Sequence, residues 1–382
     1  MTEVPASATP AQEVPDGAGE AADAPAEVEP EVAVATESEA KRATVDVGLE
    51  GLKVESADGK HGIKFGLLAR TRHIGSFGGG GSPDSDFSIA MLRPVLSGHI
   101  FGDRVRYFIQ AEVAGTQRLL DAEFDVKIVD GVGVTVGQML TPFTRAFLTP
   151  VPKLQMADFG LVNDAFRINR DVGFKLHAAP GRGIVEGQAG LYSGDGFKRD
   201  TSTARDINPL FVARVAVNPL GPMAYDQTPS LVGEVPFRVA IGANAYTNVV
   251  TASPPEGEVL GANERMLTLG GDVALQSARV MLLAEGFWRR SWTRRPELTP
   301  APDMWGSYAQ AGVFVWPKRV ELVARAGVLD RGLGAGREGS YEGGLNGYIA
   351  GNHLKLQLRY GCLHTAMTGC RHLLTTQAQV WF

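Results

Sequence analysis

The sequence has few cysteines, no long apolar run and no excess of basic residues. Of its 382 residues only Cys362 and Cys370 are cysteines, and 37 lysines and arginines face 42 aspartates and glutamates. No concentrated basic patch is present, so no nucleic-acid partner is expected. No stretch approaches the roughly 20 apolar residues of a membrane helix. That absence does not exclude a membrane, because the strands of a barrel hide their apolar half by alternation.

The two cysteines lie in one short stretch, YGCLHTAMTGC, which is expected to connect two strands. A disulfide across this connection would fit an oxidising compartment such as a cell surface, and two free thiols are the alternative. His364 and His372 lie nearby, but their spacing matches no zinc pattern well. Neither a metal nor a cofactor is expected.

Motifs of catalysis are also missing. The seven histidines are scattered without ligand spacing, and the stretch Ser193 to Gly196 lacks the strand–turn–helix context of a nucleophile elbow. The glycine run at residues 78–81 is followed by Ser-Pro rather than by a helix start, which argues against a phosphate-binding loop. An enzyme is therefore not expected.

Residues 1–45 consist of Pro, Ala, Glu and Val in no fixed period, with almost only acidic charges. Such a segment cannot bury enough apolar surface to order itself, so a disordered acidic tail is expected, either as a solvated tail or as a docking arm. The start of the chain has neither the basic residues nor the apolar core of a signal peptide, so an exported protein would be numbered here from beyond its signal. The remaining residues, 46–382, form the second predicted unit.

From residue 61 onward the chain alternates apolar and polar residues in sixteen short runs. Each run predicts a strand with one apolar and one polar face. The first is expected at residues 61–75 and the second at 87–100, with a Gly-rich interruption between them. Turns are tight after most even-numbered strands, and connections are mostly longer after odd-numbered ones. An even strand number with connection lengths segregated in this way is typical of a bacterial outer-membrane barrel with a water-filled lumen.

The last ten residues, LLTTQAQVWF, show the pattern most clearly. Alternate apolar residues can be counted back from the C-terminal aromatic residue, as in the insertion signal of outer-membrane barrels, and Val380 and Phe382 carry that signal here. The opposite face holds Thr375, Gln377 and Gln379. A terminal strand of a soluble sandwich is the alternative, although a long apolar edge at a terminus invites aggregation unless the barrel is closed.

Several motifs between residues 134 and 197 resemble the phosphate-selective porin O and P family. They are Gly137-Gln138, Pro142-Phe143, Arg170-Asp171-Val172-Gly173 and the stretch from Tyr192 to Gly196. The resemblance implies an all-β fold: a sixteen-stranded antiparallel transmembrane β-barrel, trimeric, with its third long loop folded inward to narrow the pore. That loop is residues 141–169 in this chain.

One departure from the family bears on selectivity. Members that select phosphate carry an adjacent arginine pair early in the second strand, and that pair falls on Ala90-Met91 here, with only Arg93 close by. A broader pore than a phosphate filter is therefore expected.

The polar faces of the strands and the inward loop supply the candidate pore-lining and constriction residues, although plain solvation explains many such charges in a porin. These residues are Arg70, Arg72, Arg93, Arg106, Lys127, Arg145, Arg167, Arg170 and Lys175. Asp158 and Asp164 oppose the arginines of the loop. Because rings of fixed charge set ion preference, we expect a Gram-negative outer-membrane porin with a mild anion preference that could include phosphate. Its partners would be outer-membrane lipid, small ions and hydrophilic solutes, and two further copies in a homotrimer. The alternative is a closed structural barrel that anchors a periplasmic or surface assembly.

Overall fold

The computed structural model describes residues 42–194, 209–233, 235–248, 265–292, 302–332 and 336–382. The expected acidic tail, apart from its last four residues, lies outside the described residues. None of the described helices is both long and apolar enough to cross a membrane.

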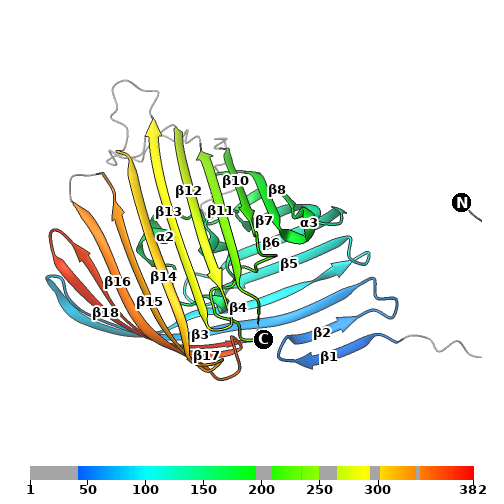
Figure 1. Cartoon of the computed structure of the whole chain (residues 1–382). Coiled ribbons are helices and arrows are strands. Elements are labelled where there is room, and N and C mark those ends of the chain that lie inside the picture. Colours follow the sequence, from blue (N-terminus) through cyan, green and yellow to red (C-terminus); the bar gives the residue numbers. More distant parts are fainter. Residues whose placement is uncertain (1–41, 195–208, 234, 249–264, 293–301, 333–335) are drawn as a thin grey trace, which may run out of the picture. The chain divides into compact units, whose positions relative to one another are not determined.

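Sixteen strands form one closed antiparallel barrel, in which each strand pairs with the next along the chain and the last pairs with the first (Figure 1). This confirms the predicted fold class and strand number. The strands are β3 (Gly62–Gly78), β4 (Gly81–Ile100), β5 (Val105–Glu112), β6 (Arg118–Val129), β7 (Val132–Leu140), β8 (Arg170–Ala178), β9 (Val185–Tyr192), β10 (Leu210–Val217), β11 (Arg238–Asn248), β12 (Arg265–Gln276), β13 (Val280–Trp292), β14 (Met304–Trp316), β15 (Val320–Asp330), β16 (Arg337–Tyr348), β17 (Leu354–Thr365) and β18 (Gly369–Trp381).

The C-terminal strand closes the barrel. In β18, Gln377 pairs with Arg72 of β3, and the register continues to Trp381. Beyond it, Phe382 exchanges two backbone hydrogen bonds with Leu67, at 2.9 and 3.1 Å. A closed ladder leaves no edge strand in the bilayer, where an unpaired backbone group would cost several kcal/mol.

A short hairpin precedes the barrel and was not predicted. It consists of β1 (Thr44–Gly48) and β2 (Gly51–Glu55), and β2 pairs with the first residues of β3. Leu52 lies opposite Phe65, on the same edge of β3 that β18 occupies further along (Figure 1). Residues 44 and 45, which the sequence placed in the tail, therefore belong to a strand.

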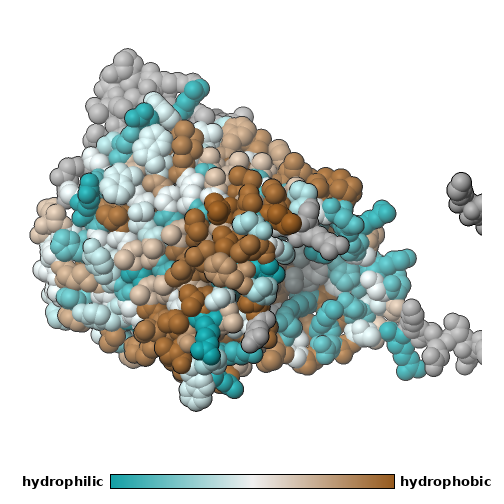
Figure 2. Space-filling model, viewed as in Figure 1, coloured by the Kyte–Doolittle hydropathy of each residue, from teal (hydrophilic) through white to brown (hydrophobic). Residues whose placement is uncertain are grey.

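The two faces of each strand have opposite environments. On β17, Leu356, Leu358 and Tyr360 point outward and are exposed, whereas the alternate residues Lys355 and Gln357 point inward and are buried. Figure 2 shows hydrophobic side chains gathered on the outer surface of the near wall. An apolar outside and a polar inside is the pattern of a barrel in lipid.

Two predicted connections are shorter than expected. The Gly-rich stretch after residue 75 was expected to separate the first two strands. Instead β3 continues to Gly78 and β4 begins at Gly81, so that only two residues form the turn. The φ angles of Gly78, Gly79 and Gly80 are 80°, 62° and 76°. Only glycine adopts such angles at little cost, which permits the tight turn. Similarly, the expected connection around the two cysteines is a three-residue turn between β17 and β18, and both cysteines lie within the strands.

Candidate functional site

Residues 141–169, named here the inner segment, connect β7 and β8 and pack against inward-facing side chains of the barrel. The segment contains three short helices, α1 (Arg145–Leu148), η1 (Val151–Lys153) and α2 (Gly160–Phe166). Phe143 and Phe166 are almost completely buried, and their rings lie 5.5 and 5.3 Å from the ring of Phe287 on β13. Such aromatic contacts bury much apolar area, so they attach both ends of the segment to the wall.

A buried carboxylate on β13 receives the start of α1. Glu285 accepts hydrogen bonds from the backbone N–H of Arg145 at 2.6 Å and of Ala146 at 3.3 Å, and from Asn163 Nδ2 at 2.8 Å. The first N–H groups of a helix have no partner within the helix. Glu285 supplies that partner and also joins α1 to α2 through Asn163.

Two charged side chains hold the middle of the inner segment. Lys355 Nζ on β17 donates to the carbonyl oxygens of Pro152 at 2.9 Å and Leu154 at 2.8 Å. Glu321 on β15 accepts from Gln155 Nε2 at 2.6 Å. Lys355 and Glu321 are both fully buried, so these charge-assisted bonds are not weakened by solvent.

A third attachment is centred on Asp158. Its carboxylate contacts Arg325 Nη2 at 2.7 Å and Arg359 Nη1 at 2.6 Å. Burial opposes ionisation of this carboxyl, but Arg359 and Arg325 outweigh it and hold the pKa of Asp158 below its ordinary value. Glu342 pairs with both arginines, at 2.8 and 2.9 Å. The inner segment is thus fixed at its start, middle and end.

A second connection enters the lumen from the opposite end of the barrel. Residues 218–237 join β10 to β11, and within them Gln227 and Thr228 are buried. The Gln227 backbone N–H donates to the carbonyl of Lys153 at 3.2 Å, and the Arg145 guanidinium lies 4.8 Å from the centre of the Tyr225 ring. The two connections therefore meet inside the barrel and occupy the part of the lumen beside β10 to β18.

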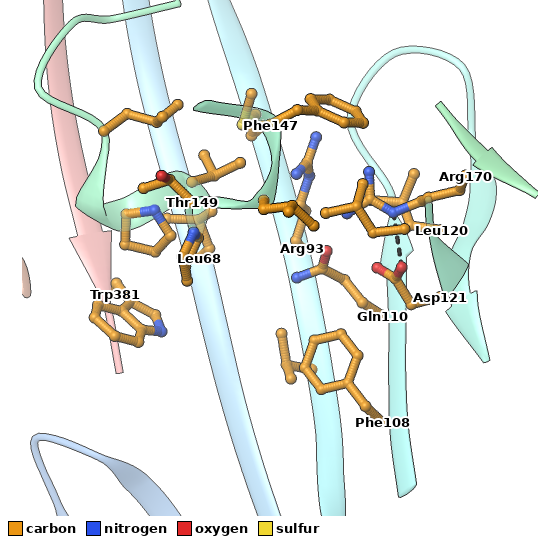
Figure 3. Close-up of a pocket in the computed structure, with 18 of the residues that line it drawn as sticks. Leu68, Arg93, Phe108, Gln110, Leu120, Asp121, Phe147, Thr149, Arg170 and Trp381 are labelled. Atoms are coloured by element: carbon orange, nitrogen blue, oxygen red, sulfur yellow. Dashed lines mark hydrogen bonds and ion pairs between the residues drawn. The ribbon is translucent and has the colours of Figure 1, made fainter. Parts of the chain in front are cut away.

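The remaining open space lies along the opposite wall. Inward side chains such as Arg214 on β10 are buried, whereas Glu123 on β6 and Lys175 on β8 are partly exposed. A cavity of about 750 Å³ lies between the inner segment and the wall formed by β3 to β8 (Figure 3). A second space of about 660 Å³ continues it toward the short-turn ends and shares Phe108 and Lys175 with it. Because they share lining residues, these two spaces are the candidate path along this side of the barrel.

Positive charge predominates at the first cavity. Of the described residues, eight basic and four acidic side chains line it. Arg70 and Arg72 on β3 are held by neutral acceptors: Gln379 and the carbonyl of Val151 for the first, and Gln377 and the carbonyl of Ala157 for the second. Arg70 is completely buried and Arg72 partly buried at the edge of the cavity, and no carboxylate within 4.0 Å among the described residues neutralises either charge.

Arg93, Arg167 and Arg170 of the cavity each have an acidic partner. Arg93 contacts Glu112 at 2.7 Å, Arg170 contacts Asp121 at 2.8 Å, and Arg167 contacts Asp164 at 3.0 Å. Figure 3 shows Arg93 and Arg170 beside the same space, with the Asp121 contact drawn as a dashed line. These pairs lower the net charge without removing the guanidinium groups from the path.

The predicted pore residues are not all at this cavity. Arg106 lines the second space, and Lys175 lines both. Lys127 lines neither, because its ammonium group is drawn to Asp103 and Asp130 near a short turn, at 2.6 Å from each. Arg145 also lines neither, because its side chain is buried against Tyr225.

Met91 lines the cavity at one of the two positions where the family resemblance would place arginines. In the pairing of β3 with β4, Arg70 lies opposite Met91 and Thr71 lies opposite Ile89, so Ala90 has no partner on β3. Positions 90 and 91 are therefore not equivalent. Met91 is uncharged, so it does not supply the positive charge of the arginine pair that the resemblance would place here.

Alternation along the strands places Glu285, Glu321, Lys355 and Arg325 on the inner face, but the sequence does not identify them as attachments for the inner segment. Alternation along a strand gives the face of a residue, and nothing in the sequence gives its partner across the lumen. The apolar lining from Phe147, Leu148 and Val151 was also missed, because these residues lie in an irregular stretch without a period.

The remaining predicted residues lie on β17 and β18 and at the end of the chain, where Phe382 also lines the first cavity. Cys362 on β17 and Cys370 on β18 are joined by a disulfide with their Cα atoms 5.6 Å apart. Val380 is exposed on the outward face of β18, and Phe382 follows it at the end of the chain.

The closed sixteen-stranded barrel with an apolar outside and a charged, partly filled lumen defines an outer-membrane porin. A family model for the phosphate-selective porin O and P family matches residues 79–382, and the chain belongs to this family. No curated protein matches the chain in a sequence comparison.

Solved structures with the same fold include several outer-membrane channels. The anion-selective porin from Comamonas acidovorans is 11% identical, with a TM-score of 0.59, over 84% of this chain and 100% of that chain. The outer membrane channel DcaP of Acinetobacter baumannii is 12% identical, with a TM-score of 0.58, over 84% and 97%. OmpT of Vibrio cholerae in a trimer form is 11% identical, with a TM-score of 0.54, over 84% and 99%. At these identities the likeness shows the fold.

Proposed function

We propose that this porin is a water-filled channel for the passive diffusion of small hydrophilic solutes, with a mild preference for anions. The observation that carries the proposal is the excess of basic side chains at the cavity, above all Arg70 and Arg72, which have only neutral partners. Fixed positive charge in a narrow path attracts anions and repels cations. The acidic partners of Arg93, Arg167 and Arg170 keep the preference mild.

The proposed path follows the β3 to β8 wall, because the inner segment and the connection between β10 and β11 occupy the other side. The third long loop then sets the size limit, as the family resemblance implies. Phosphate would pass as one anion among others, since Met91 stands in place of an arginine at the cavity. Transport rather than catalysis is the activity of this site.

A homotrimer in outer-membrane lipid is the proposed assembly. A solved structure with the same fold, OmpT of Vibrio cholerae, is described as a trimer form. The exposed apolar outward faces of the strands can be covered by lipid or by neighbouring subunits.

The variant Lys175→Gln tests the charge argument. Lys175 lines both spaces, and its ammonium group lies within 4.0 Å of no carboxylate in the described part of the chain. One unit charge acting through water at a distance of about 6 Å favours an anion and disfavours a cation by about 0.7 kcal/mol each, or roughly a tenfold change in their permeability ratio. We expect the ratio of chloride to potassium permeability, measured from zero-current potentials in planar bilayers, to fall by up to that factor.

Lys60→Gln is the matched control, because Lys60 lies in an exposed turn that lines neither space. This control should leave the ratio unchanged. An unchanged ratio in Lys175→Gln, or equal changes in both variants, would contradict the proposed path.

A further inference from the structure

One flank of the cavity is apolar, which a path for hydrated inorganic ions does not require. Phe147, Leu148, Pro150 and Val151 of the inner segment line it together with Leu120 of β6. Leu148 and Val151 are only partly buried, and Pro150 is exposed. The carbon atoms of these side chains offer no hydrogen bond to the water molecules that hydrate a small ion. They can, however, contact an apolar solute.

The flank that faces these residues carries two arginines with donor groups to spare. Arg93 contacts Glu112 through Nε, and Arg170 contacts Asp121 through Nε. Within the described residues, the Nη atoms of neither side chain donate a hydrogen bond, and none of these atoms is both buried and unpaired. A guanidinium group binds a carboxylate with two parallel N–H donors, so each arginine can still receive one.

The two flanks border the same space. Figure 3 shows Arg93 directed toward Phe147, and Arg170 beside Leu120. The volume of about 750 Å³ falls within the range of sites that hold small organic molecules. A solute with a carboxylate at one end and a compact apolar body at the other would satisfy both flanks at once.

We propose that this cavity binds small organic monocarboxylates with an apolar body, such as aromatic carboxylates, in preference to inorganic anions and to short polar acids. The proposal deepens the proposed function and rests on it, because it assigns the kind of anion that the path favours. Glu112 and Asp121 offset part of the positive charge, which disfavours a doubly charged ion that is attracted by charge alone. The apolar body adds contact area that does not depend on charge.

The test measures block of the chloride current. The purified full-length protein is placed in planar bilayers, and potassium benzoate or potassium acetate is added at constant chloride concentration. The two carboxylates share charge and head group and differ in apolar body. Covering one ring face should lower the half-blocking concentration of benzoate about tenfold below that of acetate.

Variants connect the effect to the apolar flank. In Leu148→Ser the half-blocking concentrations of benzoate and acetate should become equal within about twofold. Leu220→Ser is the control, because Leu220 is also an exposed leucine but lies in the connection between β10 and β11 and lines neither space. It should keep the tenfold difference.

Two results would overturn the inference: equal block by benzoate and acetate in the unmodified protein, or a tenfold difference that persists in Leu148→Ser. The zero-current potential of the same bilayers separates this inference from the proposed function. An anion-preferring channel that does not distinguish benzoate from acetate refutes only the preference for an apolar body. A cation-preferring channel refutes the proposed function and the inference together.

Discussion

Lys355 is the attachment whose loss should change the channel most without destroying the barrel. Its ammonium group is completely buried and donates to two backbone carbonyls of the inner segment, at 2.9 and 2.8 Å. In Lys355→Met the side chain keeps a similar length but loses every donor. The carbonyl of Leu154 then loses the donor that Lys355 supplied, whereas the carbonyl of Pro152 keeps a hydrogen bond from Gln379 Nε2 at 3.2 Å.

The magnitude follows from the one carbonyl that loses its donor. A buried carbonyl left without a donor costs about 1–3 kcal/mol, so the middle of the inner segment loses about 1–3 kcal/mol of attachment. Removing a buried charge recovers part of this cost. Glu285 and Arg325 still hold the two ends, and the barrel ladder is untouched. Residues 150–155 should therefore loosen while the barrel stays closed.

Single-channel recordings in planar bilayers provide the assay. Lys355→Met should show a larger mean conductance and greater open-channel noise than the unmodified protein, because the inner segment borders the open cavity. Lys60→Met, in an exposed turn, should match the unmodified protein. If Lys355→Met has the same conductance and noise as the control, the reasoning that Lys355 fixes the constriction is refuted.

Three further changes test other parts of the molecule. Asp272→Asn removes the negative charge that pairs with the buried Arg214 and one of the two oxygens that accept from it, at 2.6 and 2.9 Å, so the barrel should lose about 3–5 kcal/mol and unfold at a lower temperature in detergent, as followed by circular dichroism. Deleting Phe382 removes its two backbone hydrogen bonds with Leu67 and should reduce the amount assembled in the outer membrane, while channels that do assemble conduct normally; full assembly would speak against an insertion signal. Deleting residues 1–41 should leave the conductance unchanged, whereas a barrel that serves as an anchor would lose a partner that co-purifies with the full chain.

The barrel could be predicted because its signal is local. Alternation places each residue on a face, and the terminal strand shows this clearly, with Gln377 and Gln379 buried inside and Val380 exposed outside. Strand ends were less certain where glycine allowed a tight turn, as at residues 78–81. The hairpin β1–β2 was missed because its two runs of five residues are too short to reveal a period and adjoin the acidic segment.

The site could be predicted only in part, because its shape depends on pairs far apart in the sequence. The face of Arg70 followed from alternation, but its partner Gln379 lies 309 residues away. Arg145 was expected at the constriction from its place in the loop, yet stacking on Tyr225 of another connection turns it away from the cavity. The residues of the apolar flank show no periodic pattern in the sequence. Only the structure, which places them opposite Arg93 at the same cavity, indicates that they can contact a solute.

The zero-current potential of the unmodified protein tests the central claim most directly. In a planar bilayer with a tenfold gradient of potassium chloride, an anion-preferring pore lets more chloride than potassium move toward the dilute side. The excess of basic side chains at the cavity therefore predicts that the dilute compartment becomes negative. A dilute compartment that becomes positive would show a preference for potassium and would contradict the account.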